Sequence, residues 1–211
     1  AGTLRLGTNF LNGHSLPDHG AWKDNGVPYN TANFYFSVTP FEWIEFGITF
    51  TLLKMQSNVN GVLKKGYNGK DRNFNLKLRP LKEGKYYPAV AVGLYDFIPS
   101  SQNNDSPVKG KSYWKSWFIG VTKHFDFGSH RIGANLTYRR YASERNHRWN
   151  GLIGGVTYAP PVKGLEALAE WSGCSLNFGA QYTLWKQLRF QACLVDCRYP
   201  NAGVCWIPDL F

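Results

Sequence analysis

The feature that most constrains the fold is a strict alternation of apolar and polar side chains that recurs along the chain. In residues 72–79, apolar side chains fall on one face of an extended strand: Phe74, Leu76 and Leu78. Polar side chains fall on the opposite face: Asn75, Lys77 and Arg79. This period of two residues predicts a β-strand with one apolar and one polar face.

Similar segments follow one another from end to end, and no helical period competes over ten or more residues. The expected strands are residues 3–11, 33–39, 43–53, 72–79, 88–97, 112–125, 130–141, 150–158, 164–171, 175–184, 188–197 and 203–207. No run of 18 apolar residues is present, which excludes a transmembrane helix but not a membrane barrel. The pattern predicts an all-β chain of about twelve strands.

The connections between these segments alternate in length. Residues 13–31, 55–71 and 98–111 are long and polar, whereas residues 39–42 and 126–129 are short. Short turns at one end and long loops at the other are typical of outer-membrane barrels, and a soluble sandwich or lipocalin-type barrel does not require them. We therefore expect one antiparallel up-and-down transmembrane β-barrel over residues 1–211, in the outer membrane of a Gram-negative cell.

The polar faces decide which way the strands point. A dry core could not hold these side chains without partners, because an unpaired buried polar group costs several kcal/mol. A hydrated lumen can hold them, so Phe74, Leu76 and Leu78 are expected to meet lipid. The candidate lumen or ligand-contacting residues are Asn75, Lys77, Arg79, Asp96, Arg139, Asn177, Gln181 and Arg189. Asp96 either pairs with a lumen base or simply ends its strand.

Aromatic residues make up 16% of the chain, and several stand near strand ends. Those expected to form interfacial girdles are Tyr35, Trp43, Tyr86, Tyr87, Trp185 and Phe211.

The formal net charge of +10 fits nucleic acid, an anionic lipid surface or an acidic ligand as a partner. No nucleic-acid-binding signature is present, so nucleic acid is not expected. The expected partners are outer-membrane lipid and lipopolysaccharide, with anionic polysaccharide and other envelope proteins as further candidates.

Four cysteines lie in the last fifth of the chain: Cys174, Cys193, Cys197 and Cys205. Their spacing matches no zinc template, and their even number favours disulfides over buried thiols. Folding the last three strands as hairpins predicts the pairs Cys174–Cys197 and Cys193–Cys205. The first pair needs a bulge or a frayed strand end, because its two cysteines fall on opposite registers.

The chain contains no nucleophile elbow, metalloprotease helix, phosphate loop or dinucleotide fingerprint. His124, Asp126 and His130 surround a short turn, where such residues are ordinary. We expect no catalytic residues, no metal site and no cofactor, and an outer-membrane enzyme is the alternative from another class.

The sequence resembles the YjbH-like outer-membrane barrels linked to exopolysaccharide biosynthesis. The resemblance covers roughly residues 1–140 and rests on GTLRLG, PFEWIEFGITF, DRNFNLKLRPLKEGKYYPAVAVGLYDF and VTKHF. Its middle block combines a basic strand, an acidic turn and a small-apolar strand that ends in Asp, here Lys77, Glu83, Pro88, Ala89, Gly93 and Asp96. The family continues with a Gly-Thr turn, where this chain has FIPSS.

The resemblance implies an outer-membrane barrel linked to polysaccharide. Together with the missing catalytic motifs, it leads us to expect a non-enzymatic barrel that acts in the assembly or export of surface or extracellular polysaccharide. A small solute channel and a scaffold subunit of a larger envelope complex are the alternatives. A barrel of about twelve strands has a narrow lumen, which side chains and loops can partly fill.

Overall fold

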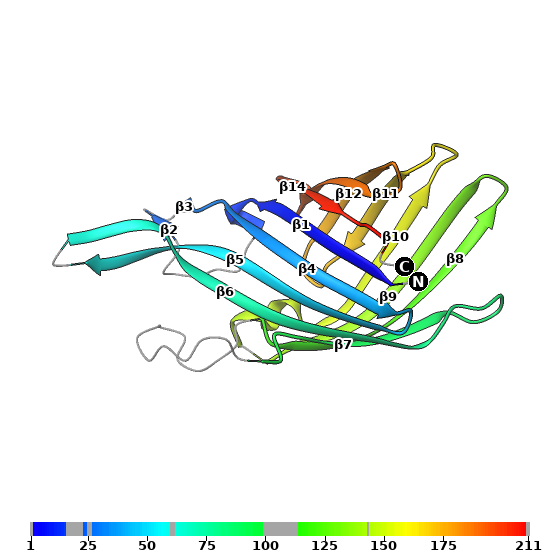
Figure 1. Cartoon of the computed structure of the whole chain (residues 1–211), viewed down its shortest axis with the longest axis horizontal. Helices are drawn as coiled ribbons and strands as arrows, with labels where there is room; N and C mark the ends of the chain where they lie inside the picture. The colour runs from blue at the N-terminus through cyan, green and yellow to red at the C-terminus, as the bar shows by residue number, and fades with distance from the viewer. Residues whose placement is uncertain are drawn as a thin grey trace.

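The computed structural model describes residues 2–15, 23–24, 27–59, 62–98, 114–142 and 144–209. Twelve antiparallel strands close into one barrel, and each pairs with its neighbours in chain order (Figure 1). The ring closes where β1 pairs with both β4 and β14. This confirms the predicted all-β, up-and-down barrel and its strand number.

The barrel strands are β1 (Thr3–Leu11), β4 (Thr31–Phe41), β5 (Ile44–Val59), β6 (Val62–Leu81), β7 (Ala89–Tyr95), β8 (Ser116–Phe127), β9 (His130–Tyr141), β10 (Gly151–Ala159), β11 (Leu165–Trp171), β12 (Leu176–Leu184), β13 (Leu188–Val195) and β14 (Tyr199–Trp206). Outside the barrel sheet, the described residues also form a short hairpin and 3₁₀ turns: β2 (Lys23–Asp24), β3 (Val27–Pro28), η1 (Gly13–Ser15) and η3 (Glu144–Trp149). No helix in the described ranges is long and apolar enough to cross a membrane.

The two ends of the barrel differ, as the connection lengths predict. One end, here called the turn end, carries both chain termini and the connections 42–43, 82–88, 128–129, 160–164 and 185–187 (Figure 1). The opposite end, here called the loop end, carries η1, η3 and the turns 172–175 and 196–198.

Cross-strand register fixes which side chains point inward. Leu76 lies opposite Phe46 and Leu94, and this row is on the outside. Lys77, one residue along, lies opposite Glu45 and lines the interior. Because successive side chains alternate across a strand, the same split runs around the barrel. Phe74, Leu76 and Leu78 share the outer face, as their alternation predicts.

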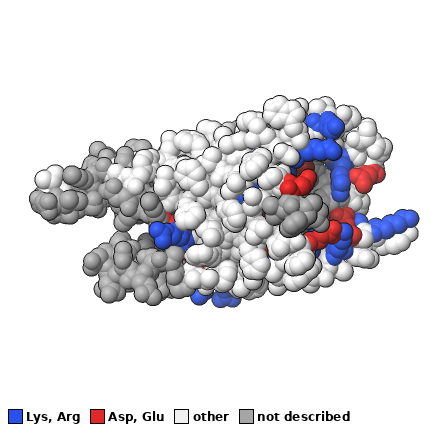
Figure 2. Space-filling view, in the orientation of Figure 1, with Lys and Arg blue, Asp and Glu red and all other residues white. Residues whose placement is uncertain are grey.

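Many apolar side chains lie on the outer surface of the barrel. Leu136 and Leu152 are 51% and 58% exposed, whereas in the described ranges the buried hydrophobic side chains are only Tyr141 and Cys205. Figure 2 shows one face of the molecule, in the orientation of Figure 1. Most charged side chains on this face gather at the turn end, while its middle is mostly uncharged. Exposed apolar side chains in such numbers are disfavoured in water and are typical of surfaces that contact lipid or another protein.

Inside the barrel, two glycines make room for aromatic rings that lie against the wall. A Cβ at Gly93 would collide with the ring of Phe118, and a Cβ at Gly7 would collide with the ring of Tyr35. Tyr35 therefore points inward, so its assignment to a girdle is wrong. Its register is that of Asn33 and Ser37, the polar face of β4, and this parity decides its direction.

The other predicted girdle residues behave differently. Trp43, Tyr86, Tyr87 and Trp185 are exposed on the connections of the turn end. Phe211 lies outside the described residues.

Where the expected loop over residues 55–71 is described, at residues 55–59 and 62–71, it is instead β-strand. β5 and β6 continue as an antiparallel ladder from Ile44↔Leu78 to Val59↔Val62, with a register shift between Leu53 and Met55. Figure 1 shows this hairpin extending well beyond the rest of the barrel. Residues 55–71 lack a clear alternation because a hairpin that leaves the barrel wall has no single face to bury, while its backbone bonds still form.

The predicted disulfides Cys174–Cys197 and Cys193–Cys205 are wrong, because all four cysteines are free thiols. Cys193 lies opposite Asn201, and Cys205 lies opposite Arg189. The two thiols are thus four residues apart along the ladder, roughly 13 Å, whereas a disulfide needs Cα atoms within about 7 Å. At the loop end, Cys197 Sγ instead lies 3.3 Å from the carbonyl oxygen of Leu176.

Candidate functional site: the barrel lumen

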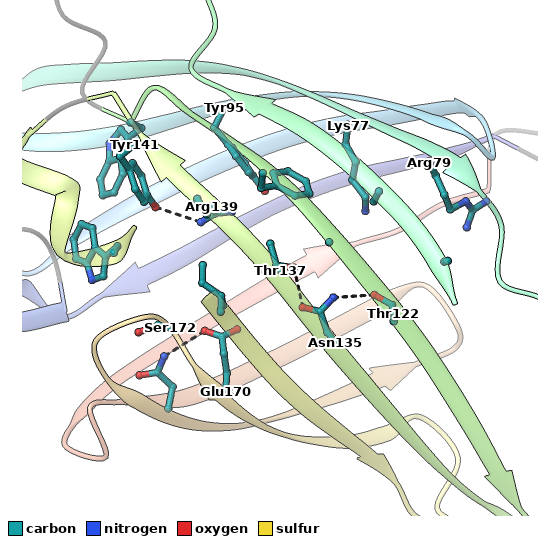
Figure 3. Close-up of a pocket in the computed structure, with 18 of the residues that line it drawn as sticks. Lys77, Arg79, Tyr95, Thr122, Asn135, Thr137, Arg139, Tyr141, Glu170 and Ser172 are labelled. Carbon is teal, nitrogen blue, oxygen red and sulfur yellow. Dashed lines mark hydrogen bonds between the residues drawn. The ribbon is translucent and has the colours of Figure 1, made fainter. Parts of the chain in front are cut away.

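The lumen contains a cavity of about 1010 Å³. Its lining includes Lys82 and Arg131 near the turn end, and Trp149 and Ser172 near the loop end. Figure 3 shows side chains from β6 to β11 pointing into it. The cavity therefore extends along the barrel between side chains that belong to its two ends.

At the turn end, the bases Lys77, Arg79 and Lys82 that line the cavity belong to a network of opposite charges. Glu45 Oε1 accepts a hydrogen bond from Arg5 Nη1 at 3.4 Å, and Glu45 Oε2 lies 3.7 Å from Lys77 Nζ. Glu42 lies 3.5 Å from Arg79 and 2.6 Å from Lys82. Because each glutamate contacts two bases, these four bases keep a net positive charge beyond their paired acids.

Glu83 ties the connection 82–88 to the barrel wall. Its Oε1 accepts hydrogen bonds from the His124 backbone N–H at 2.7 Å and from Lys123 Nζ at 3.1 Å, and its Oε2 lies 2.7 Å from His124 Nδ1. β7 begins only at Ala89, opposite Thr122, so this carboxylate replaces the missing strand beside His124. These hydrogen bonds lower the pKa of Glu83 from 4.5 to about 2, and the bond with the His124 ring has the largest effect.

The middle of the cavity is uncharged and rich in amide and hydroxyl groups. Asn135 Nδ2 donates to Thr122 Oγ1 at 2.8 Å and to the Val121 carbonyl at 3.0 Å. Asn135 Oδ1 accepts from Thr137 Oγ1 at 3.0 Å (Figure 3). Such groups exchange hydrogen bonds with water or with a hydroxylated solute at little cost.

Toward the loop end, an arginine is packed among aromatic rings. The Arg139 guanidinium carbon lies 4.9 Å from the ring centre of Tyr95 and 5.7 Å from that of Phe118. Arg139 Nη1 donates to the Tyr141 hydroxyl at 3.2 Å. Trp149 of η3 lies next to Tyr141, with ring centres 6.1 Å apart. The result is an aromatic wall around one cation.

Polar side chains from β11 and β12 complete this part of the cavity. Glu170 lies two strands from Arg139 and accepts a hydrogen bond from Asn177 Nδ2 at 3.3 Å. Ser172 and Ser175 share a hydrogen bond of 2.8 Å in the turn between the two strands. All four side chains line the same cavity as Arg139.

A family model identifies the chain. The model named YjbH, described as exopolysaccharide biosynthesis protein YbjH, matches residues 26–198. The chain belongs to the YjbH family. The resemblance seen in the sequence is thereby confirmed, and the match extends past residue 140 through most of the barrel.

Several solved structures resemble this YjbH-family barrel in shape. The outer membrane phospholipase A from Escherichia coli has 10% identity and a TM-score of 0.40, with 100% of this chain and 97% of that chain covered. The Salmonella typhi outer membrane phospholipase dimer with bound calcium has 10% identity and a TM-score of 0.40, with 100% and 91% covered. A mutant of the Rh. blastica porin has 9% identity and a TM-score of 0.37, with 98% of each chain covered. Likenesses of this size say nothing of what this chain does. No curated protein matches its sequence.

The structure distributes the eight predicted lumen residues of the YjbH-family barrel over several places. Lys77, Arg79, Arg139 and Asn177 line the large cavity. Gln181 lines a second cavity of about 440 Å³ near β12–β14. Arg189 lies opposite Thr183 and donates from Nε to Thr183 Oγ1 at 3.4 Å.

The remaining two predicted residues form a structural joint. Asp96 is 2% exposed and has a positive φ of 51° at the end of β7, and its Oδ2 accepts from the Trp114 N–H at 3.2 Å. Asn75 Oδ1 accepts from the Asp96 N–H at 3.3 Å, and Asn75 Nδ2 donates to Thr49 Oγ1 at 3.3 Å. These contacts close the end of a strand, which favours the strand-ending interpretation of Asp96 over a ligand role.

Sequence reasoning missed the aromatic wall. Phe118 shares its register with Gly120, Thr122 and His124, so an aromatic ring stands among small and polar residues on an inward face. An aromatic residue on the otherwise small and polar face of this strand could have been recognised in the sequence as a sign of an inward-pointing ring. The partners Tyr95, Tyr141 and Trp149 come from other elements, and only the fold brings them together.

Proposed function

We propose that this barrel spans the bacterial outer membrane and acts, without catalysis, in the assembly or export of surface or extracellular polysaccharide. The observation that carries this proposal is the YjbH family match over residues 26–198, combined with a polar cavity that extends between the two ends of the barrel.

The membrane part of the proposal rests on the outer surface. A closed barrel satisfies its backbone hydrogen bonds between strands, which a lipid environment requires. Its exposed apolar side chains and the charges gathered at the turn end match a barrel whose middle faces lipid (Figure 2). We place the turn end on the periplasmic side of the membrane, so that the short turns face the periplasm and the long connections face the outside.

The polysaccharide part rests on the cavity lining. Sugars offer hydroxyl groups around their rings and apolar C–H faces above and below them. The Asn and Thr side chains in the middle suit the hydroxyls, and the rings near the loop end suit the C–H faces. A small solute channel would use the same lumen. A scaffold subunit would not need a lumen lined with polar and aromatic side chains.

Deletion of the gene in its native host tests the role. We expect secreted or cell-bound polysaccharide to fall by about tenfold or more, and the full-length chain supplied from a plasmid to restore it. Polysaccharide at the parental level in the deletion strain would contradict the proposal. Hydrolysis of lipid or glycan by the purified barrel would contradict its non-catalytic part.

A further inference from the structure

We infer that Arg139 and the aromatic wall around it form a subsite for a carboxylate-bearing sugar, so that the polymer handled by this barrel is acidic. The inference rests on the proposed function and adds the chemical class of its substrate. It arises from one cation whose surroundings differ from those of the other bases in the cavity.

Among the described residues, no acid lies within ion-pair distance of Arg139. Lys77, Arg79 and Arg131 each form an ion pair with a glutamate or an aspartate. Within the described ranges Arg139 forms none, and its Nε has no hydrogen-bond partner. Glu170 interacts electrostatically with Arg139 but does not lie within ion-pair distance of it. A planar carboxylate in the cavity would fit the fork of guanidinium donors better than any neutral group.

The rings hold this guanidinium in place. Tyr95 and Phe118 lie side by side against it, and Phe118 packs over Gly93, where a side chain would displace the ring. The bond from Nη1 to the Tyr141 hydroxyl fixes its direction along the wall (Figure 3). A cation that is held before the ligand arrives binds an anion with less loss of side-chain entropy.

The rest of the subsite suits the other parts of a sugar acid. The rings of Tyr141 and Trp149 border the cavity and offer apolar surface to the C–H face of a pyranose. Trp149 also stacks with Trp114 and contacts the Arg148 guanidinium. Glu170, Asn177 and Ser172 offer acceptors and donors for hydroxyl groups. Because Glu170 would repel a second carboxylate, the acidic group belongs at Arg139 and the hydroxyl groups belong at Glu170.

Two sugar hexamers of equal length test this directly. β-1,4-Linked mannuronate and β-1,4-linked mannose hexamers differ only in the carboxylate or CH₂OH at C6, and calorimetry with the full-length barrel in detergent measures both affinities. We expect the acidic hexamer to bind about tenfold tighter or more, and R139Q to remove that preference. R139K, which keeps the charge but not the fork, should retain part of it.

R189Q is the matched control, because Arg189 also points inward without an ion pair in the described ranges but does not line the large cavity. It should keep the wild-type preference. Equal binding of the two hexamers, binding of neither, or an unchanged preference in a folded R139Q barrel would overturn the inference. Those results would leave the polysaccharide defect of the deletion strain untouched, so the two proposals fail separately.

Discussion

An arginine in place of Leu76 is expected to lower the free energy of unfolding by about 2–4 kcal/mol. Leu76 lies on the outer face of β6, between Phe46 and Leu94, both of which are exposed. If lipid covers this row, the L76R side chain must hold its charge in hydrocarbon or bend toward the interface. Equilibrium unfolding by urea from lipid vesicles measures the difference.

A91R is the matched control for this prediction. Ala91 lies on the neighbouring strand β7 and lines the cavity, opposite Gly120, so the added charge meets water rather than lipid. We expect its cost to stay below about 1 kcal/mol. A cost for L76R no larger than that for A91R would mean that the outer row of β6 does not face lipid.

The second large effect is expected at Gly93, where alanine should cost about 1–3 kcal/mol. The added methyl would collide with the Phe118 ring and lie 3.0 Å from the Leu76 carbonyl oxygen. The ring packs against Tyr95 and Arg139 and has to leave this position. Denaturant unfolding gives the stability change, and the hexamer affinities should fall with it, because the wall around Arg139 loosens.

G47A separates this collision from the general effect of adding a methyl group to a strand glycine. Gly47 also points inward, but the nearest atoms to its added Cβ are 3.5 Å away, an ordinary contact. Its stability should change by less than about 0.5 kcal/mol. If G93A and G47A behaved alike, the close packing of Phe118 on Gly93 would be unimportant.

The direction of the side chains could be predicted from the sequence because a strand alternates regardless of its neighbours. The alternation of Phe74 and Lys77 already determines which of them can face lipid, once a closed barrel is assumed. The strand expected over residues 164–171 is confirmed as β11, which continues the antiparallel array. Tyr35 was assigned to a girdle because it stands near a strand end. Its place in the alternation, on the polar face of its strand, would have predicted the inward direction that the structure shows.

The cysteine pairing could not be predicted, because it depends on the register between strands rather than on the order along one strand. The ladder of β13 and β14 sets Cys193 against Asn201, and this offset comes from the turn at residues 196–198. The site around Arg139 could not be predicted from the sequence for a related reason. Its rings come from β7, β8, β9 and η3, and the Gly93 position that admits Phe118 is on a strand that pairs with β8 only in the folded barrel.

The central claim is that polysaccharide occupies the lumen, and site-specific photocrosslinking in the native host tests it most directly. A benzophenone amino acid placed at Ala91 would point into the cavity, and at Val92 it would point outward from the same strand. After illumination of cells that produce the polymer, we expect glycan attached to the denatured, purified barrel from position 91 and none from position 92. Glycan at neither position, or equally at both, would contradict the account.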